Sequence, residues 1–298
     1  MDDLADYRLP FGLPYIVIPL VFSPIHLRIL YVLLRHKEYR KMECYRIMTQ
    51  IEIFDTLIVP FYIFQGFSIL FESPICGFTV FFGVITSALL TCIVCMDVVL
   101  ALNRLQVFCN IRYPRLIDKA LQVIVWLGGA TFCGVCYSSL AGFLLSADGF
   151  TLQGDFSKPW TASIGFYLAY IPLGSFLTTF TTYIVIFLYL LYKKARTENI
   201  QTNSAEWRIL AQAVVRFLGD GSIEATLFYQ ITFTVDNTSP MFSQIFHFAS
   251  LINFVCIPPI VFLVLNRSVR SHVIGITMFE KKASIQVALV KEMKASLN

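Results

Sequence analysis

The sequence predicts an all-α membrane protein, a bundle of seven transmembrane helices with its N-terminus outside the cell. Three features of the chain lead to this prediction: its composition, the length of its apolar stretches and the placing of its basic residues. Of the 298 residues, 57% are hydrophobic and only 14% are charged, whereas a soluble domain carries roughly 25% charged residues. Most of the surface must therefore face lipid, which suits a chain with 28 Phe and 14 Tyr.

The apolar stretches are long enough to cross a bilayer. A helix needs about 20 mostly apolar residues to span a hydrocarbon core of ~30 Å. Six stretches meet this requirement readily: residues 11–34, 45–70, 74–103, 121–145, 162–192 and 241–266. A seventh stretch, residues 207–233, is interrupted by Arg216, Asp220 and Glu224. We count it as a span, because without it the basic C-terminal segment would fall outside the cell.

The basic residues indicate the direction of the chain, because loops that face the cytoplasm collect Lys and Arg. Nineteen of the 23 basic residues fall in alternate connections and the C-terminal segment, and only Arg8 and Lys158 fall in the other connections. The chain thus divides into an extracellular N-terminus (1–10), a seven-helix domain (11–266) and a cytoplasmic tail (267–298). Residues 269–279 mix basic and apolar side chains, which predicts a short amphipathic helix on the inner leaflet after the seventh span.

Short motifs in three of the stretches resemble those of a known receptor family. They are Leu-Ala-Leu-Asn-Arg ending at Arg104, Tyr-Arg-Ile-Met beginning at Tyr45 with Asp55 further along, and Pro259, Phe262, Asn266 and Arg270 of the seventh stretch. Together they resemble the nematode serpentine receptor class T family of seven-transmembrane G-protein-coupled receptors. The resemblance implies a chemosensory receptor of the plasma membrane. The membrane of a sensory cilium is one expected location. Such a receptor binds a small extracellular molecule and signals through a heterotrimeric G protein.

The resemblance and the charges within the spans together give a set of candidate switch residues. Arg104 would stabilise the inactive state and meet the G protein; the alternative is an arginine that reaches to anionic headgroups. An ionisable group costs at least ~2.5–3.5 kcal/mol at the centre of a membrane helix, so such groups face partners or water. The candidate coupling and switch residues are Asn103, Arg104, Asp55, Asp97, Arg216, Asp220, Pro259, Phe262 and Asn266.

Helix depth predicts two ion pairs among these charges. Asp97 lies at a depth where Arg216 can reach it. Arg28 and Glu52 both lie about 10 Å inside the cytoplasmic boundary, at a rise of 1.5 Å per residue. The network either rearranges on activation or simply holds the helices together. A sodium ion at Asp55 is a further hypothesis, which is weakened because Pro258 stands where rhodopsin-like receptors carry Asn.

The outer half of the bundle supplies a candidate ligand pocket, aromatic with few polar groups. Each of its residues would equally serve in helix packing. The third stretch has no carboxylate in its outer half, which disfavours a charged amine. The seventh has no Lys for an opsin-like Schiff base. The candidate ligand-binding residues are Phe82, Thr86, Tyr167, Tyr170, Tyr229, Gln230, Gln244 and His247.

Other functions find less support in the sequence. No motif offers a nucleophile, a metal set or a phosphate cradle, so we expect neither an enzyme nor a cofactor. No basic block with interleaved aromatics indicates nucleic acid as a partner. The spacing of Cys92 and Cys95 resembles a zinc site, but both lie in hydrocarbon and we expect no metal. An ion- or proton-coupled transporter that uses the intramembrane carboxylates remains the alternative, although no internal repeat is visible.

Two features of the outer surface stay open. Cys76 lies where receptors of this kind anchor a disulfide, but the partner loop, residues 146–161, contains no Cys. Either the disulfide is absent or Cys76 is simply a small apolar residue. Asn237-Thr238-Ser239 is a glycosylation sequon, and the following Pro240 and the nearby membrane both oppose its use.

Overall fold

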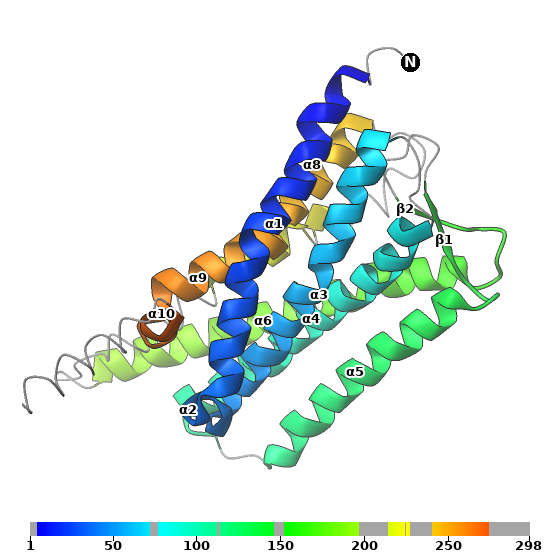
Figure 1. The fold of residues 1–298 in the computed structure, drawn as a ribbon. Coiled ribbons are helices and arrows are strands. Elements are labelled where there is room, and N and C mark those ends of the chain that lie inside the picture. Colours follow the sequence, from blue (N-terminus) through cyan, green and yellow to red (C-terminus); the bar gives the residue numbers. More distant parts are fainter. Residues whose placement is uncertain are drawn as a thin grey trace, which may run out of the picture.

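The computed structural model describes residues 5–71, 77–111, 114–145, 152–196, 214–223, 225–226 and 240–273. Within these residues the chain is almost entirely helical (Figure 1). The helices of the first two thirds are α1 (Ala5–Arg35), α2 (Lys37–Lys41), α3 (Glu43–Phe71), α4 (Phe78–Cys109), α5 (Arg115–Tyr137) and α6 (Thr161–Arg196). Residues 214–223 are also helical. The last part comprises α8 (Pro240–Leu251), the π-helical turn η3 (Ile252–Cys256), α9 (Ile257–Leu265) and α10 (Arg267–Val273).

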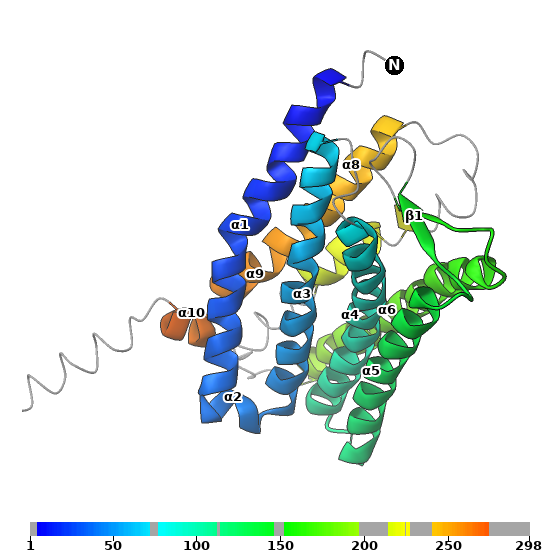
Figure 2. The ribbon, with the colours of Figure 1, turned by 45° about the vertical axis from the view of Figure 1, so that its right-hand side comes forward.

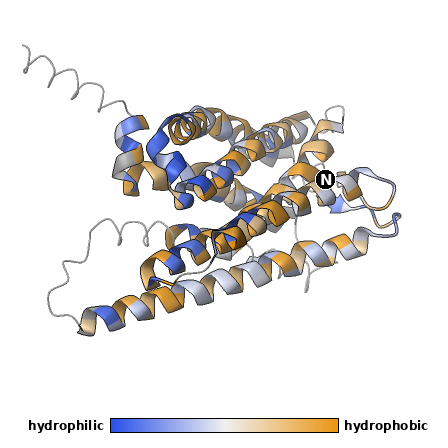
Figure 3. Ribbon diagram, turned by 90° about the horizontal axis from the view of Figure 1, so that it is seen from below, coloured by the Kyte–Doolittle hydropathy of each residue, from blue (hydrophilic) through white to orange (hydrophobic). Residues whose placement is uncertain are grey.

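The described helices confirm the membrane character of the chain. Six of them are long and apolar enough to cross a membrane, and they coincide with the six stretches that the sequence predicts readily. Residues 214–223 belong to the seventh predicted span, most of the rest of which lies outside the described residues. Hydrophobic residues run along the whole length of the helices (Figure 3).

Helix α4 is the centre of the bundle. It packs against α3, α5 and α6 and is the most deeply buried of the six spans. Helix α1 packs on α3, and α5 covers one side of α4 (Figure 2). The main apolar core lies where α1, α3 and α4 meet η3, with Ile29, Ile58, Ile93 and Phe254 fully buried in it.

The two ends of the bundle carry different elements. The N-terminal end of α1 lies at one end and α2 at the other (Figures 1 and 2). The hairpin of β1 (Phe143–Leu145) and β2 (Leu152–Gly154) lies nearer the N-terminal end. Helix α10 lies beside α2, because the Tyr39 hydroxyl is 3.1 Å from Nδ1 of His272.

Helix α10 confirms a helix after the seventh span, but it begins at Arg267 rather than at residue 269. The reason is a cap: Asn266 Oδ1 accepts the N–H of Val269 at 3.2 Å, which satisfies a donor of the first turn. The other side of the same amide donates to the Tyr45 hydroxyl at 3.3 Å. Val269 is fully buried, so the helix is held by packing as well as by its cap. Residues 274–279 of the predicted helix lie outside the described residues.

The structure corrects several predicted boundaries. Arg104 does not end its helix, since α4 continues to Cys109 and ends at Asn110 in the left-handed conformation (φ 51°). Helix α5 begins at Arg115 and ends at Tyr137, so residues 143–145 form β1 and not the end of a helix. The short α2 was not predicted. Hydropathy marks where a chain leaves the hydrocarbon, whereas α4 and the start of α5 extend beyond that point. At the other end of α5 the apolar residues 143–145 pair as a strand instead of continuing the helix.

Helices α1 and α3 approach so closely at Gly66 that no side chain fits there. A Cβ at Gly66 would lie 2.8 Å from the carbonyl oxygen of Gly12 and 2.7 Å from the Ile16 side chain. We expect Gly66→Ala to lower the free energy of unfolding by about 1–3 kcal/mol, measured as a fall in thermal stability of the purified protein. The matched control is Gly174→Ala on α6, where a Cβ meets nothing within 4 Å and alanine favours the helix. Equal stability of the two variants would contradict the close approach.

Candidate switch site in the helix core

A fully buried ion-pair site joins α1 to α3. His26 Nδ1 lies 2.6 Å from Glu52 Oε1, and neither side chain is exposed. On the other side of the ring, His26 Nε2 lies 2.9 Å from the carbonyl oxygen of Val255 in η3. A carbonyl only accepts, so Nε2 carries a proton. One further proton then lies between Nδ1 and Glu52, and the pair as a whole is neutral.

The sequence of the seventh span explains why the Val255 carbonyl is free to accept. In a regular helix this carbonyl would bond to the N–H of residue 259. Residue 259 is proline, which has no N–H. The preceding π-helical turn, Ile252–Cys256, is a feature found frequently at functional sites. Pro259, a candidate switch residue, therefore acts here by leaving a carbonyl for His26.

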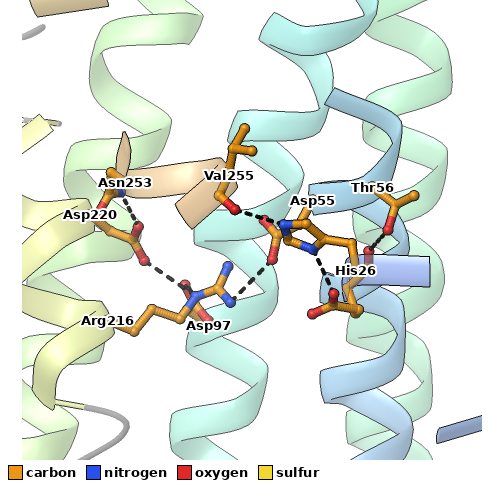
Figure 4. Close-up of polar contacts among 9 residues, drawn as sticks. His26, Asp55, Thr56, Asp97, Arg216, Asp220, Asn253 and Val255 are labelled. Carbon is orange, nitrogen blue, oxygen red and sulfur yellow. Dashed lines mark hydrogen bonds and ion pairs between the residues drawn. The ribbon is translucent and has the colours of Figure 1, made fainter. Parts of the chain in front are cut away.

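A second polar cluster surrounds the guanidinium of Arg216 (Figure 4). Its Nη1 donates to Asp55 Oδ2 of α3 at 3.3 Å. Its Nε lies 3.6 Å from Asp97 Oδ2 of α4 and 3.5 Å from Asp220 Oδ2. Asn253 of η3 donates to the other oxygen of Asp220 at 2.8 Å. One arginine thus joins residues 214–223 to α3 and α4, and the predicted Asp97–Arg216 contact is confirmed.

Arg104 lies beside the same cluster. It is 3% exposed and donates from Nη1 to the Tyr183 hydroxyl of α6 at 3.2 Å. A cavity of about 40 Å³ lies between Arg104, Tyr183, Arg216 and Asp220, with Phe262 among its apolar walls. Arg104 therefore does not extend to headgroups in this structure. Asn103 beside it is also buried.

The structure contradicts the predicted pair of Arg28 and Glu52. Arg28 is exposed; its Nε donates to the carbonyl of Val273 at 3.4 Å. His26 takes its place at Glu52. Two residues along a helix turn the side chain by about 200°, so depth alone does not decide which residue faces the neighbour. The guanidinium of Arg216 likewise lies at Asp55, where the sequence suggested a sodium ion.

The candidate ligand-binding residues that the structure describes lie on α4, α6 and α8. Thr86 is buried and its hydroxyl has no hydrogen-bond partner, while Phe82 is partly buried and stacks on Phe64. Tyr167 and Tyr170 of α6 are 36% and 54% exposed, which suits a lipid-facing surface better than a pocket. His247 is partly buried on α8, the side chain of Gln244 is not described, and Tyr229, Gln230 and Asn237 lie outside the described residues. Cys76 is also outside them.

A small aromatic cluster ties α10 to α2 at the end that carries Arg104. The rings of His36 and His272 lie 4.3 Å apart, and Tyr39 packs against His272. Desolvation, and then the neighbouring His272, lower the pKa of His36 below its ordinary value. The lowered pKa favours the neutral form of His36 at neutral pH.

The fold has a clear counterpart among solved structures. The chain is similar to squid rhodopsin in its crystal structure, with a TM-score of 0.71 over 91% of this chain and 85% of that chain, at 12% sequence identity. The chain thus has the fold of squid rhodopsin and, with six described helices that are long and apolar enough to cross a membrane, is a multi-pass membrane protein. No protein-family model matches the sequence, and no curated protein matches it.

Proposed function

We propose that the chain is a chemosensory G-protein-coupled receptor that binds a small, neutral or weakly polar molecule from outside. The seven-helix fold supports a receptor rather than an enzyme. The observation that carries the proposal is the placing of Arg104. It is a buried arginine held by Tyr183 beside the cavity that Arg216 also lines.

The contacts of Arg216 support the mechanism. Residues 214–223 are held against α3 and α4 through Asp55 and Asp97. When these contacts break, the segment moves away and uncovers Arg104 for a heterotrimeric G protein. A ligand shifts this equilibrium only by the difference between its affinities for the two states, typically 1–3 kcal/mol. Thr86, with its buried hydroxyl lacking a partner, is the polar group that we propose to meet the ligand.

The first test is the substitution Arg104→Ala in a G-protein activation assay. We expect the variant to reach the cell surface and to lose most of its coupling, because no cation is then uncovered. The matched control is Arg46→Ala, an exposed arginine on α3 whose partner is the nearby Glu43. Wild-type coupling of Arg104→Ala at equal surface expression would contradict the proposal. A transport flux assay on the same cells addresses the transporter alternative.

The orientation of the chain is part of the proposal. The positive charges of alternate connections place the N-terminus outside and α2 and α10 in the cytosol. The measurement uses epitope tags at the N-terminus and the C-terminus of the protein, stained in cells that are not permeabilised. We expect staining of the N-terminal tag only, at the plasma membrane. Staining of the C-terminal tag would reverse the orientation.

A further inference from the structure

Two carboxyl groups meet in the core of the bundle. Oδ2 of Asp97 on α4 and Oδ2 of Asp220 in residues 214–223 lie 3.6 Å and 3.5 Å from the same nitrogen, Nε of Arg216. Asp220 is only 6% exposed, and Nε of Arg216, which both oxygens approach, has a single N–H to donate. Two ionised carboxylates have no hydrogen atom to place between them and repel each other. The close approach of these two carboxylates therefore requires a further proton or cation beside Arg216.

Among the residues that the structure describes, the nearby cations do not supply enough positive charge. The three aspartates Asp55, Asp97 and Asp220 face one guanidinium, that of Arg216. Arg104 is the other cation on the walls of the same cavity. Three negative charges, of which Asp55 and Asp220 are buried, thus face two positive ones, and an uncompensated charge in such surroundings is strongly disfavoured. The His26–Glu52 pair beyond Asp55 is neutral and does not change this balance.

We propose that Asp97 and Asp220 form a proton-binding site, in which one proton is shared between the two carboxyl groups. The proton supplies a second donor for the two oxygens that share the single N–H of Arg216 Nε, and it brings the described charges of the cluster to neutrality. The groups that face the site are Arg216 beside Asp220, Asp55 of α3, Arg104 of α4, Tyr183 of α6 and Asn253 of η3, with His26 and Glu52 further away.

The site links the position of residues 214–223 to pH. Asp97 and Asp220 belong to different segments, so their separation removes the reason to share a proton, which then leaves to water. The cavity of about 40 Å³ has room for about three waters at roughly 10–15 Å³ each. Proton binding therefore favours the packed bundle, and alkaline pH favours its opening. This second consequence rests on the proposed receptor mechanism, whereas the proton site itself does not.

The test measures the stability of the purified protein in lipid nanodiscs from about pH 5 to about pH 8. The folded state holds one proton that the unfolded carboxylates lose, so wild-type stability should fall as pH rises, by up to about tenfold in the folding equilibrium per pH unit. Asp97→Asn and Asp220→Asn carry an amide N–H in place of the proton and should lose this dependence. Asp155→Asn, at a partly exposed position directly after β2, is the control and should keep it.

Infrared spectroscopy provides a second measurement that needs neither ligand nor G protein. At neutral pH, the difference between the spectrum of the wild-type protein and that of either amide variant should show the band of a protonated carboxylic acid that the variant has lost. Absence of this band from the difference spectra, or an unchanged pH slope in both variants, overturns the proposal. So does a pH slope that disappears on adding sodium or calcium chloride, because a metal ion would then occupy the site. If one variant fails to fold, the other and the wild-type spectrum still decide.

Discussion

Replacing Glu52 with alanine is expected to lower the free energy of unfolding by about 3–5 kcal/mol. The substitution leaves His26 without its partner at a position where neither side chain is exposed. A stranded polar ring in the bundle core then has only the Val255 carbonyl as a partner. The amount of protein at the cell surface should fall with the stability. His26→Ala should have a similar effect, since Glu52 then lies buried and unpaired.

The double substitution His26→Leu and Glu52→Leu tests whether the losses come from breaking the pair rather than from changing either side chain by itself. It removes both polar groups together, so a large part of the lost surface expression should return. Arg28→Ala is the control: it removes a full charge from the same turn of α1, but an exposed one. Losses that add up, with no recovery in the double leucine variant, would show that His26 and Glu52 do not depend on each other.

Arg216→Met should be at least as damaging. Methionine has a similar reach and no charge, so Asp55, Asp97 and Asp220 would face one another with no cation between them. Breaking a buried ion pair from one side typically costs about 3–5 kcal/mol. We expect a fall in thermal stability and in surface expression, and a smaller fall for Arg216→Lys, which keeps the charge but loses the fork of donors.

Neutralising the carboxylates provides the matched experiment for Arg216. Asp55→Asn and Asp97→Asn introduced into Arg216→Met should recover stability, because fewer negative charges then remain stranded. The same two substitutions in the wild-type protein should lower its stability. If the two substitutions lowered stability in Arg216→Met as they do in the wild-type protein, Arg216 would not be what stabilises these carboxylates. Arg46→Met, on the exposed start of α3, serves as the control for loss of an arginine.

Much of the fold could be predicted from the sequence, because an apolar stretch of membrane length is a local property of the chain. The ends of the helices were harder to predict. Helix α4 extends to Cys109, well past the point at which hydropathy falls. Asn110 is the signal that could have located this end, since asparagine readily adopts the left-handed conformation of a helix cap.

The candidate site could be predicted only in part. Asp97 and Arg216 were expected to meet because their depths agree and their charges need partners. The pairing of His26 was missed, because it depends on the rotation of α1 about its axis, which packing determines. Pro259 was a usable signal, since a proline in a helix leaves the carbonyl four residues before it without a donor. Asn253 was missed because nothing local marks it as facing Asp220.

The hairpin of β1 and β2 is held in place by hydrogen bonds and not by a disulfide. Its strands pair through their main chains, and the Lys158 ammonium donates to the carbonyls of Ser138 and Ala141 at 3.2 and 3.0 Å. No cysteine occurs between residues 137 and 161, so no disulfide can tie this connection to the helices. The arrangement of this surface is consequently independent of redox conditions. It can form as soon as α5 and α6 are in place, without an oxidising step during biosynthesis.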